Sequence, residues 1–210
     1  LWSAIGMPIA LSIGMSQFKE LLSGAHSMDI HFRKTPFNKN LPVIMALLAV
    51  WYRCFFNAKS SALIPYSERL KKLPIYLQQL YMESLGKSVT NQDEAVSTNT
   101  AEILWGTVGT ASQHSYFQLL HQGTEFVPVD FIAVVEPATG GSNAKERHQH
   151  LLSNCFSQSL TLMKGRPKTN SAYEVVAGNK TSNTLLLKKL NPYNVGNLIA
   201  LYEHKVFVQS

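Results

Sequence analysis

Two polar side chains that could act on one ligand lie four residues apart near the middle of the chain. Gln79 and Glu83 share one face if their segment is helical, so a single ligand could touch both. Gly86 is expected to end this helix, which places the Glu83 carboxylate at the negative end of the helix macrodipole. That position favours a proton acceptor at neutral pH. The spacing is equally typical of a solvated glutamate near a helix end, so the pair is a hypothesis for a base and a neighbouring amide.

A second candidate is His114, which ends the run Trp105-Gly-Thr-Val-Gly-Thr-Ala-Ser-Gln-His114. The run follows a short apolar segment and has two glycines and several hydroxyl residues, so we expect a strand, a loop and then a helix over 113–121. Free backbone N–H groups at such a helix start favour an anion or a polar ligand, and the helix dipole there favours a neutral imidazole. The run is not a P-loop and lacks the GxGxxG spacing.

The remaining chemistry-bearing residues exclude several function classes. Cys54 and Cys155 lie in apolar runs without CxxC or Cys/His spacing, which predicts buried, reduced thiols in a cytosolic protein and no metal site. The sequence contains no Gly-x-Ser-x-Gly motif, and this absence argues against a serine hydrolase. The chain has 19 basic and 13 acidic residues, a net charge of +6, but the basic residues are scattered. That surplus fits a small anionic ligand, or plain solubility, better than a nucleic-acid groove.

The hydrophobic pattern indicates an α/β domain that would position these residues. The 210-residue chain is 45% hydrophobic and long enough to bury a full core. The expected strands are apolar throughout, and they alternate with helices along the chain. This pattern predicts a mostly parallel sheet with helices on both faces. The helix over 41–52 is apolar on all sides, which predicts a buried core helix too short for a membrane span. The segment 30–39 is expected to be a turn, and Leu73, Leu77 and Leu80 form the core-facing stripe of the Gln79–Glu83 helix. The expected strands are 62–66, 103–105, 126–135, 173–177 and 184–187, and the other expected helices are 1–13, 18–28, 145–164 and one that starts at Pro192.

Many segments, in order along nearly the whole chain, resemble the phosphoglucose isomerase family. They are Leu-Trp-Ser-Ala-Ile-Gly6, Leu-Leu-Ser-Gly-Ala-His26, Met28-Asp-Ile-His-Phe32, Asn40-Leu-Pro-Val43, Val50-Trp-Tyr52, Met82-Glu-Ser-Leu-Gly-Lys87, Gly-Thr-Ala-Ser-Gln-His114, Gln118-Leu-Leu-His-Gln-Gly123, Val129-Asp-Phe-Ile-Ala133, Gly178-Asn179, Thr181-Ser-Asn183 and Ala200-Leu-Tyr-Glu-His-Lys-Val-Phe-Val-Gln209. The resemblance implies a sugar-isomerase (SIS) fold, which is a three-layer α/β/α sandwich.

The resemblance also implies an activity. The family interconverts glucose 6-phosphate and fructose 6-phosphate in the cytoplasm, in glycolysis and gluconeogenesis, without a metal or organic cofactor and without nucleic-acid or membrane partners. Its base, which works through a cis-enediol, matches Glu83, and a substrate-contacting glutamine matches Gln79. A histidine that assists ring opening from the neighbouring subunit of a homodimer matches His114.

Departures from the family pattern limit what the resemblance implies. Leu85 stands where the family usually has Asn, and Val108-Gly-Thr-Ala-Ser-Gln-His114 replaces Pro-Gly-Thr-Asn-Gly-Gln-His, so we expect altered loop packing. The family's phosphate-binding Ser/Thr loop and its catalytic lysine have no counterpart here. Residues 1–35 are therefore predicted to join a missing N-terminal SIS domain, and 36–210 to be a truncated C-terminal SIS domain that is nearly inactive alone. A non-catalytic, sugar-phosphate-binding regulatory module and a pure interaction protein remain alternatives.

Overall fold

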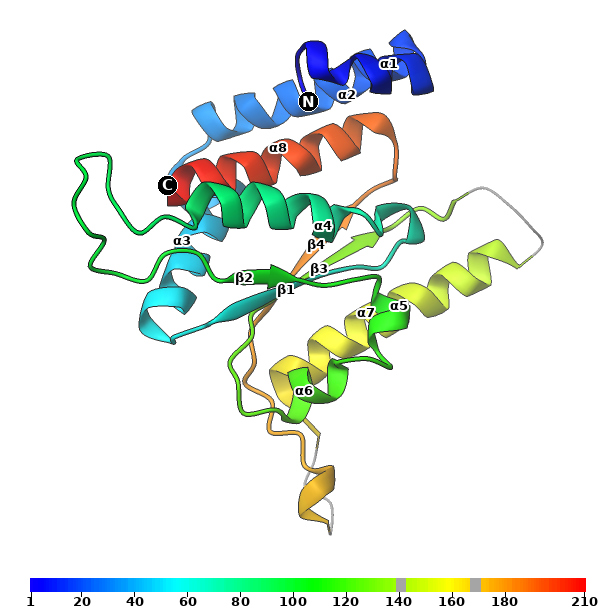
Figure 1. Cartoon of the computed structure of the whole chain (residues 1–210). Coiled ribbons are helices and arrows are strands. Elements are labelled where there is room, and N and C mark those ends of the chain that lie inside the picture. Colours follow the sequence, from blue (N-terminus) through cyan, green and yellow to red (C-terminus); the bar gives the residue numbers. More distant parts are fainter. Residues whose placement is uncertain (139–142, 167–170) are drawn as a thin grey trace. The chain divides into compact units, whose positions relative to one another are not determined.

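The chain folds into two compact units in the structure, a computed structural model that describes residues 1–138, 143–166 and 171–210 (Figure 1). Unit 1 comprises Leu1–Val50 and Lys188–Ser210, and unit 2 comprises Trp51–Leu187. The predicted division at residues 35 and 36 refers to a domain outside this sequence, and it stays a prediction.

Unit 2 is built on a parallel sheet with the strand order β2-β1-β3-β4. Neighbouring strands are all parallel. Each connection contains a helix that returns the chain to the end of the sheet where the strands begin. Ala62 at the centre of the sheet is in register with both Trp105 and Val129. The strands are β1 (Ser60–Pro65), β2 (Ile103–Trp105), β3 (Val129–Val134) and β4 (Ser182–Leu187).

Helices cover both faces of this sheet. On one face α4 (Leu73–Gln78) packs on β1 and β2. On the other lie α5 (Gly109–Ser112), α6 (Phe117–Gln122) and α7 (Ala144–Lys164), as Figure 1 shows. Because both faces are buried, the central strands are apolar on both sides, and the predicted three-layer α/β/α sandwich is confirmed. The core between β1, β3 and the second helical layer contains Ala62, Ile64, Tyr66, Phe117, Leu120, Val129, Phe131, Ala133, Cys155 and Leu162.

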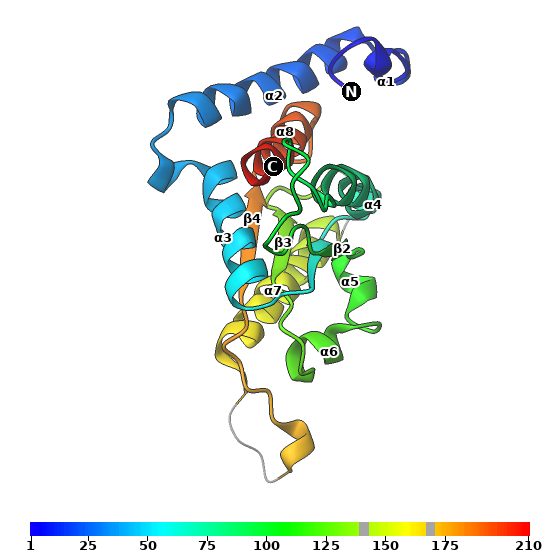
Figure 2. The same cartoon turned by 60° about the vertical axis from the view of Figure 1, so that its left-hand side comes forward.

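Unit 1 is a helical unit in which α2 (Met15–Lys34) and α8 (Pro192–Gln209) pack side by side (Figure 2). Their backbones approach closely at Gly24 and Gly196, where a Cβ would overlap the carbonyl oxygens of Tyr193 and Leu21. As predicted, α8 starts at Pro192, where the missing N–H costs no hydrogen bond. Unit 1 also contains η1 (Ala4–Gly6), α1 (Met7–Ile13), η2 (Phe37–Lys39) and the first part of α3 (Leu41–Phe55).

Three predictions about local structure are wrong. The segment 30–39 is not a turn throughout, because α2 continues to Lys34 and stops only where Thr35 becomes extended before Pro36. The helix over 41–52 is not buried on all sides, since the Trp51 side chain is 57% exposed. Residues 173–177 form no strand, and the 3₁₀ turn η5 (Ala172–Glu174) occupies the start of that segment. Within the described ranges, no helix has the length and apolar character needed to cross a bilayer.

Candidate active site

The helix that carries Glu83 changes its winding at the candidate site. After α4 the chain continues as a π-helical segment, η4 (Gln79–Glu83), which the sequence analysis did not predict. Single π-helical turns are rare and frequently occur at functional sites. Leu77, Tyr81 and Leu85 follow at intervals of four residues and are all buried, so they form the inner face of this segment. Leu80, which was predicted to belong to the inner stripe, is displaced to the outer face because Tyr81 takes that place.

Two hydrogen bonds attach this helix to β2 and to the residue directly before it. Gln78 Nε2 donates to the carbonyl oxygen of Leu104 in β2, over 3.0 Å. Tyr81 Oη donates to the Glu102 carboxylate over 2.9 Å, and both side chains are buried. A hydrogen bond to a charged acceptor is worth about 1.5–3 kcal/mol. The two bonds set the rotation of the helix about its axis, and thereby turn Gln79 and Glu83 outward.

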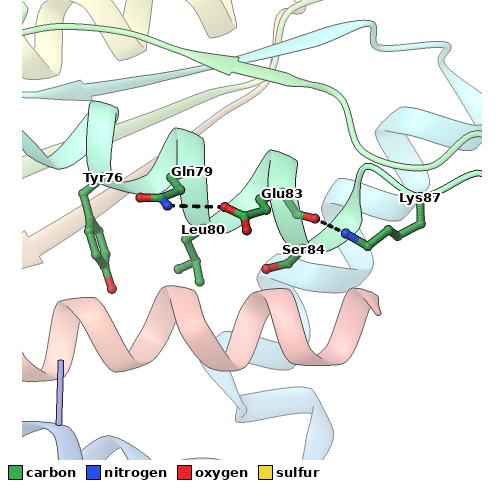
Figure 3. A pocket seen from close by; sticks show the side chains of 6 residues that line it. All are labelled: Tyr76, Gln79, Leu80, Glu83, Ser84 and Lys87. Atoms are coloured by element: carbon green, nitrogen blue, oxygen red, sulfur yellow. Dashed lines mark hydrogen bonds between the residues drawn. The ribbon is translucent and has the colours of Figure 1, made fainter. Parts of the chain in front are cut away.

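The outer face of the segment is a shallow depression of about 460 Å³. Gln79 Nε2 donates to Glu83 Oε2 over 3.3 Å, so the two predicted site residues are in contact (Figure 3). The Lys87 ammonium donates to the carbonyl oxygen of Glu83. Lys87 was not among the predicted site residues, although its spacing of four residues from Glu83 places both on one helical face. The depression is lined by Tyr76, Gln79, Leu80, Glu83, Ser84 and Lys87.

His114 lies elsewhere in unit 2. It follows α5 in the turn that leads to α6, so the prediction of a single helix over 113–121 with His114 at its start is wrong. The imidazole is exposed and lines a second depression of about 490 Å³ beyond the carboxyl ends of β1 and β2, where ligands of parallel sheets commonly bind. This depression is lined by Ser67, Glu68, Val108, Thr110, Ala111, His114 and Leu151.

The loop that carries His114 is held by internal hydrogen bonds. The backbone N–H of Thr107 donates to Tyr116 Oη over 3.0 Å. Ser112, one of the departures from the family pattern, is fully buried and donates to the carbonyl oxygen of Gly109 over 2.8 Å. Leu85, another of the departures, is buried with the inner face of the α4–η4 helix. Both replacements therefore take part in packing, while Glu83 and His114 stay exposed.

One chain does not bring Glu83 and His114 together. The two depressions share no lining residue. They are formed by helices that cover opposite faces of the sheet, since α4 packs on one face and α5 lies on the other (Figure 1). Within one chain, the two side chains therefore line separate depressions.

Cys155 and His121 lie at structural positions. Cys54 is exposed, so the prediction that it is buried is wrong. Cys155 is buried in the core, and burial raises the pKa of its thiol to about 12. His121 Nε2 pairs with Gln158 Oε1 over 2.7 Å, and burial, first among several causes, lowers the pKa of this imidazole. Across the described part of the chain, no three His, Cys, Asp or Glu side chains are grouped as metal ligands.

Comparisons with known proteins agree with this fold. The family model described as phosphoglucose isomerase matches residues 1–210. A glucose-6-phosphate isomerase of Coxiella burnetii (strain RSA 493 / Nine Mile phase I) is 49% identical over 230 residues, which cover 100% of this chain and 41% of that protein. One from Pseudomonas fluorescens is 49% identical over 228 residues, with the same coverage of 100% and 41%. The chain therefore spans well under half the length of these relatives.

Solved structures show the same fold. The crystal structure of a glucose-6-phosphate isomerase from Chlamydia trachomatis superposes with a TM-score of 0.90 and 37% identity, covering 97% of this chain and 40% of the other. A hypothetical protein from Thermus thermophilus superposes with a TM-score of 0.69 at 22% identity, covering 90% of this chain and 44% of the other. The second likeness shows the fold alone.

Proposed function

Because the chain belongs to the phosphoglucose isomerase family, we propose that it is the base-carrying part of a glucose-6-phosphate isomerase. The proposed reaction is the interconversion of glucose 6-phosphate and fructose 6-phosphate, a cytoplasmic step of glycolysis and gluconeogenesis. The observation that supports it most directly is the contact between Gln79 and Glu83 on the outer face of η4. An amide donor holds one carboxylate oxygen there, and the depression leaves the side chain open to a ligand.

Glu83 acts as the base in this proposal. Its carboxylate takes the proton from C2 of the open-chain aldose, the C–H electron pair forms the C1–C2 double bond, and the C1 oxygen gains a proton to give a cis-enediol. Return of a proton to C1, with loss of the proton on the C2 hydroxyl, gives the ketose. Gln79 orients the carboxylate and contacts the sugar. A positioned base of this kind contributes roughly 10² to 10⁴ in rate.

His114 is proposed to assist ring opening at the site of a partner subunit. The separation of the two depressions within one chain supports this arrangement. A two-fold homodimer would place each His114 against the Glu83 of the other chain and so create two identical sites. In this proposal residues 36–210 form the C-terminal SIS domain, and the segment 1–35 connects it to an N-terminal SIS domain.

The isolated chain is proposed to be nearly inactive. It spans 41% of the length of its relatives. The resemblance to the family implies that the phosphate-binding loop and the catalytic lysine belong to the part of the relatives that this chain does not cover. Remote binding of the phosphate normally drives the reacting end of a substrate into place, so its loss lowers turnover as well as affinity.

The test is the substitution Glu83→Gln in the complete enzyme, with Glu94→Gln on the exposed loop between η4 and β2 as the control. Exchange of the C2 hydrogen with deuterated water, followed by NMR, should fall by roughly 10² or more in Glu83→Gln, while sugar-phosphate binding measured by calorimetry is retained. Retained exchange in Glu83→Gln would rule out the assigned role. Sugar-phosphate binding without exchange in the unmodified enzyme would instead identify a regulatory module.

A further inference from the structure

Lys87 lies at the end of the depression that holds the proposed base. Its ammonium group donates to the main-chain carbonyl of Glu83, so it is fixed one turn beyond the carboxylate, on the side opposite Gln79 (Figure 3). The side chain is exposed and lines the depression. An ammonium group carries three N–H donors, and only one is needed for this bond.

The charges of the lining residues nearly cancel. Among the described residues that line the depression, Glu83 carries the one carboxylate and Lys87 the one cation. A sugar phosphate carries up to two negative charges near neutral pH, since the second phosphate pKa is about 6. Without the ammonium, an approaching anionic sugar would meet the Glu83 carboxylate alone, and like charges in a solvent-exposed cleft slow association and weaken binding.

We infer that Lys87 is a specificity residue for anionic sugars, which offsets the charge of the base while leaving the chemistry to Glu83. This inference rests on the proposed function, because it assumes that the depression receives a sugar phosphate. The role differs from that of a helix cap, which Lys87 also fulfils by binding a carbonyl in the last turn. A cap requires an N–H donor, whereas the specificity role requires a positive charge.

Two substitutions separate the charge from the hydrogen bond. Lys87→Gln keeps an N–H donor but removes the charge, and Lys87→Arg keeps both. Lys72→Met is the matched control, because Lys72 is an exposed lysine that precedes α4 at the far end of the same helix. Folding of each variant is checked by circular dichroism, and Lys87→Met serves as a second neutral variant.

The experiment measures kcat and KM for fructose 6-phosphate in the complete enzyme at ionic strengths of roughly 0.02 M and 0.5 M. At low salt, Lys87→Gln and Lys87→Met should raise KM by roughly three- to tenfold with little change in kcat. At high salt, where charges are screened, the difference from the unmodified enzyme should shrink to less than about twofold. Lys72→Met should behave like the unmodified enzyme, and Lys87→Arg, which keeps the charge, should give a KM closer to that of the unmodified enzyme than to that of Lys87→Gln.

Two results would overturn the inference. Equal KM values for Lys87→Gln and the unmodified enzyme at low salt would show that the charge has no role. A loss in Lys87→Gln that is independent of salt, or that falls on kcat alone, would assign Lys87 to positioning the helix. The proposed function is tested separately by Glu83→Gln. An active Glu83→Gln enzyme would refute that function whatever the Lys87 variants show. An inactive Glu83→Gln enzyme, together with Lys87 variants of unchanged KM, would refute this inference alone.

Discussion

Gln113 donates a hydrogen bond from its side-chain amide to Tyr66 Oη over 3.0 Å. This bond links the residue directly before His114 to the first residue after β1. Tyr66 is 1% exposed and belongs to the core beneath the sheet, so it is a fixed point of the fold. The position of His114 at the mouth of its depression therefore depends on a core side chain that none of the family motifs includes.

Replacing Tyr66 by Phe removes the acceptor for this bond and keeps the ring. We expect the free energy of unfolding to fall by about 1 kcal/mol, the usual net value of a hydrogen bond whose other partner can still reach water. Urea titration followed by circular dichroism measures the loss. Tyr173→Phe is the control because the Tyr173 side chain is 80% exposed, and an equal loss there would contradict the argument.

Alkaline pH should destabilise the chain through the same tyrosine. Burial, the largest cause, raises the pKa of Tyr66 to about 12 from its ordinary value of 10.0. Between these two values the unfolded chain loses the phenol proton and the folded chain keeps it, so stability falls as pH rises through this window, by up to roughly 1.4 kcal/mol per pH unit. Cys155, with a pKa raised to about 12, acts in the same direction.

The measurement is the free energy of unfolding in urea at a series of pH values above 9. In Tyr66→Phe, the loss of unfolding free energy above pH 10 should become smaller. The loss that begins near pH 9, which Cys155 causes, should remain. A decline of unchanged slope in Tyr66→Phe would mean that other groups carry the pH dependence.

Mixing two inactive variants of the complete enzyme should restore activity if the site is shared between subunits. A heterodimer of Glu83→Gln and His114→Asn chains has one site with both substitutions and one site with neither. Random exchange of subunits should therefore give about a quarter of the unmodified activity, since half of the dimers are heterodimers with one intact site each. Activity that stays at the level of the two parent variants after verified subunit exchange would place both residues in the same chain's site or outside it.

Gly24→Ala should destabilise the chain, although alanine is the better helix former by about 1 kcal/mol. The added Cβ would overlap the carbonyl oxygen of Tyr193, so α2 and α8 must separate. We expect a net loss of about 2 kcal/mol in the free energy of unfolding, as for an overpacked core. Ser23→Ala, at an exposed position of the same helix, should have no such effect, and a stabilised Gly24→Ala chain would disprove the close approach.

Much of the fold could be predicted from local patterns. Apolar strands alternating with helices predicted the parallel sheet and its two helical layers, because that order allows few other ways to bury both faces of the strands. Pro192 predicted the start of α8, and the spacing of Gln79 and Glu83 predicted that they share one face, where the structure shows them in contact. The errors occurred where an apolar run leaves a side chain exposed, as at Cys54, and where residues 113–116 form a turn between α5 and α6.

The sequence by itself determined that a carboxylate and an amide lie on one side of a helix, because Gln79 and Glu83 are four residues apart. Only the tertiary structure decided that His114 lies in a depression separate from that of Glu83, and that a π-helical turn directs Tyr81 inward in place of Leu80. The physical reason is that contacts along one helix follow from helical geometry, whereas the relation between two helices depends on how the sheet between them is packed.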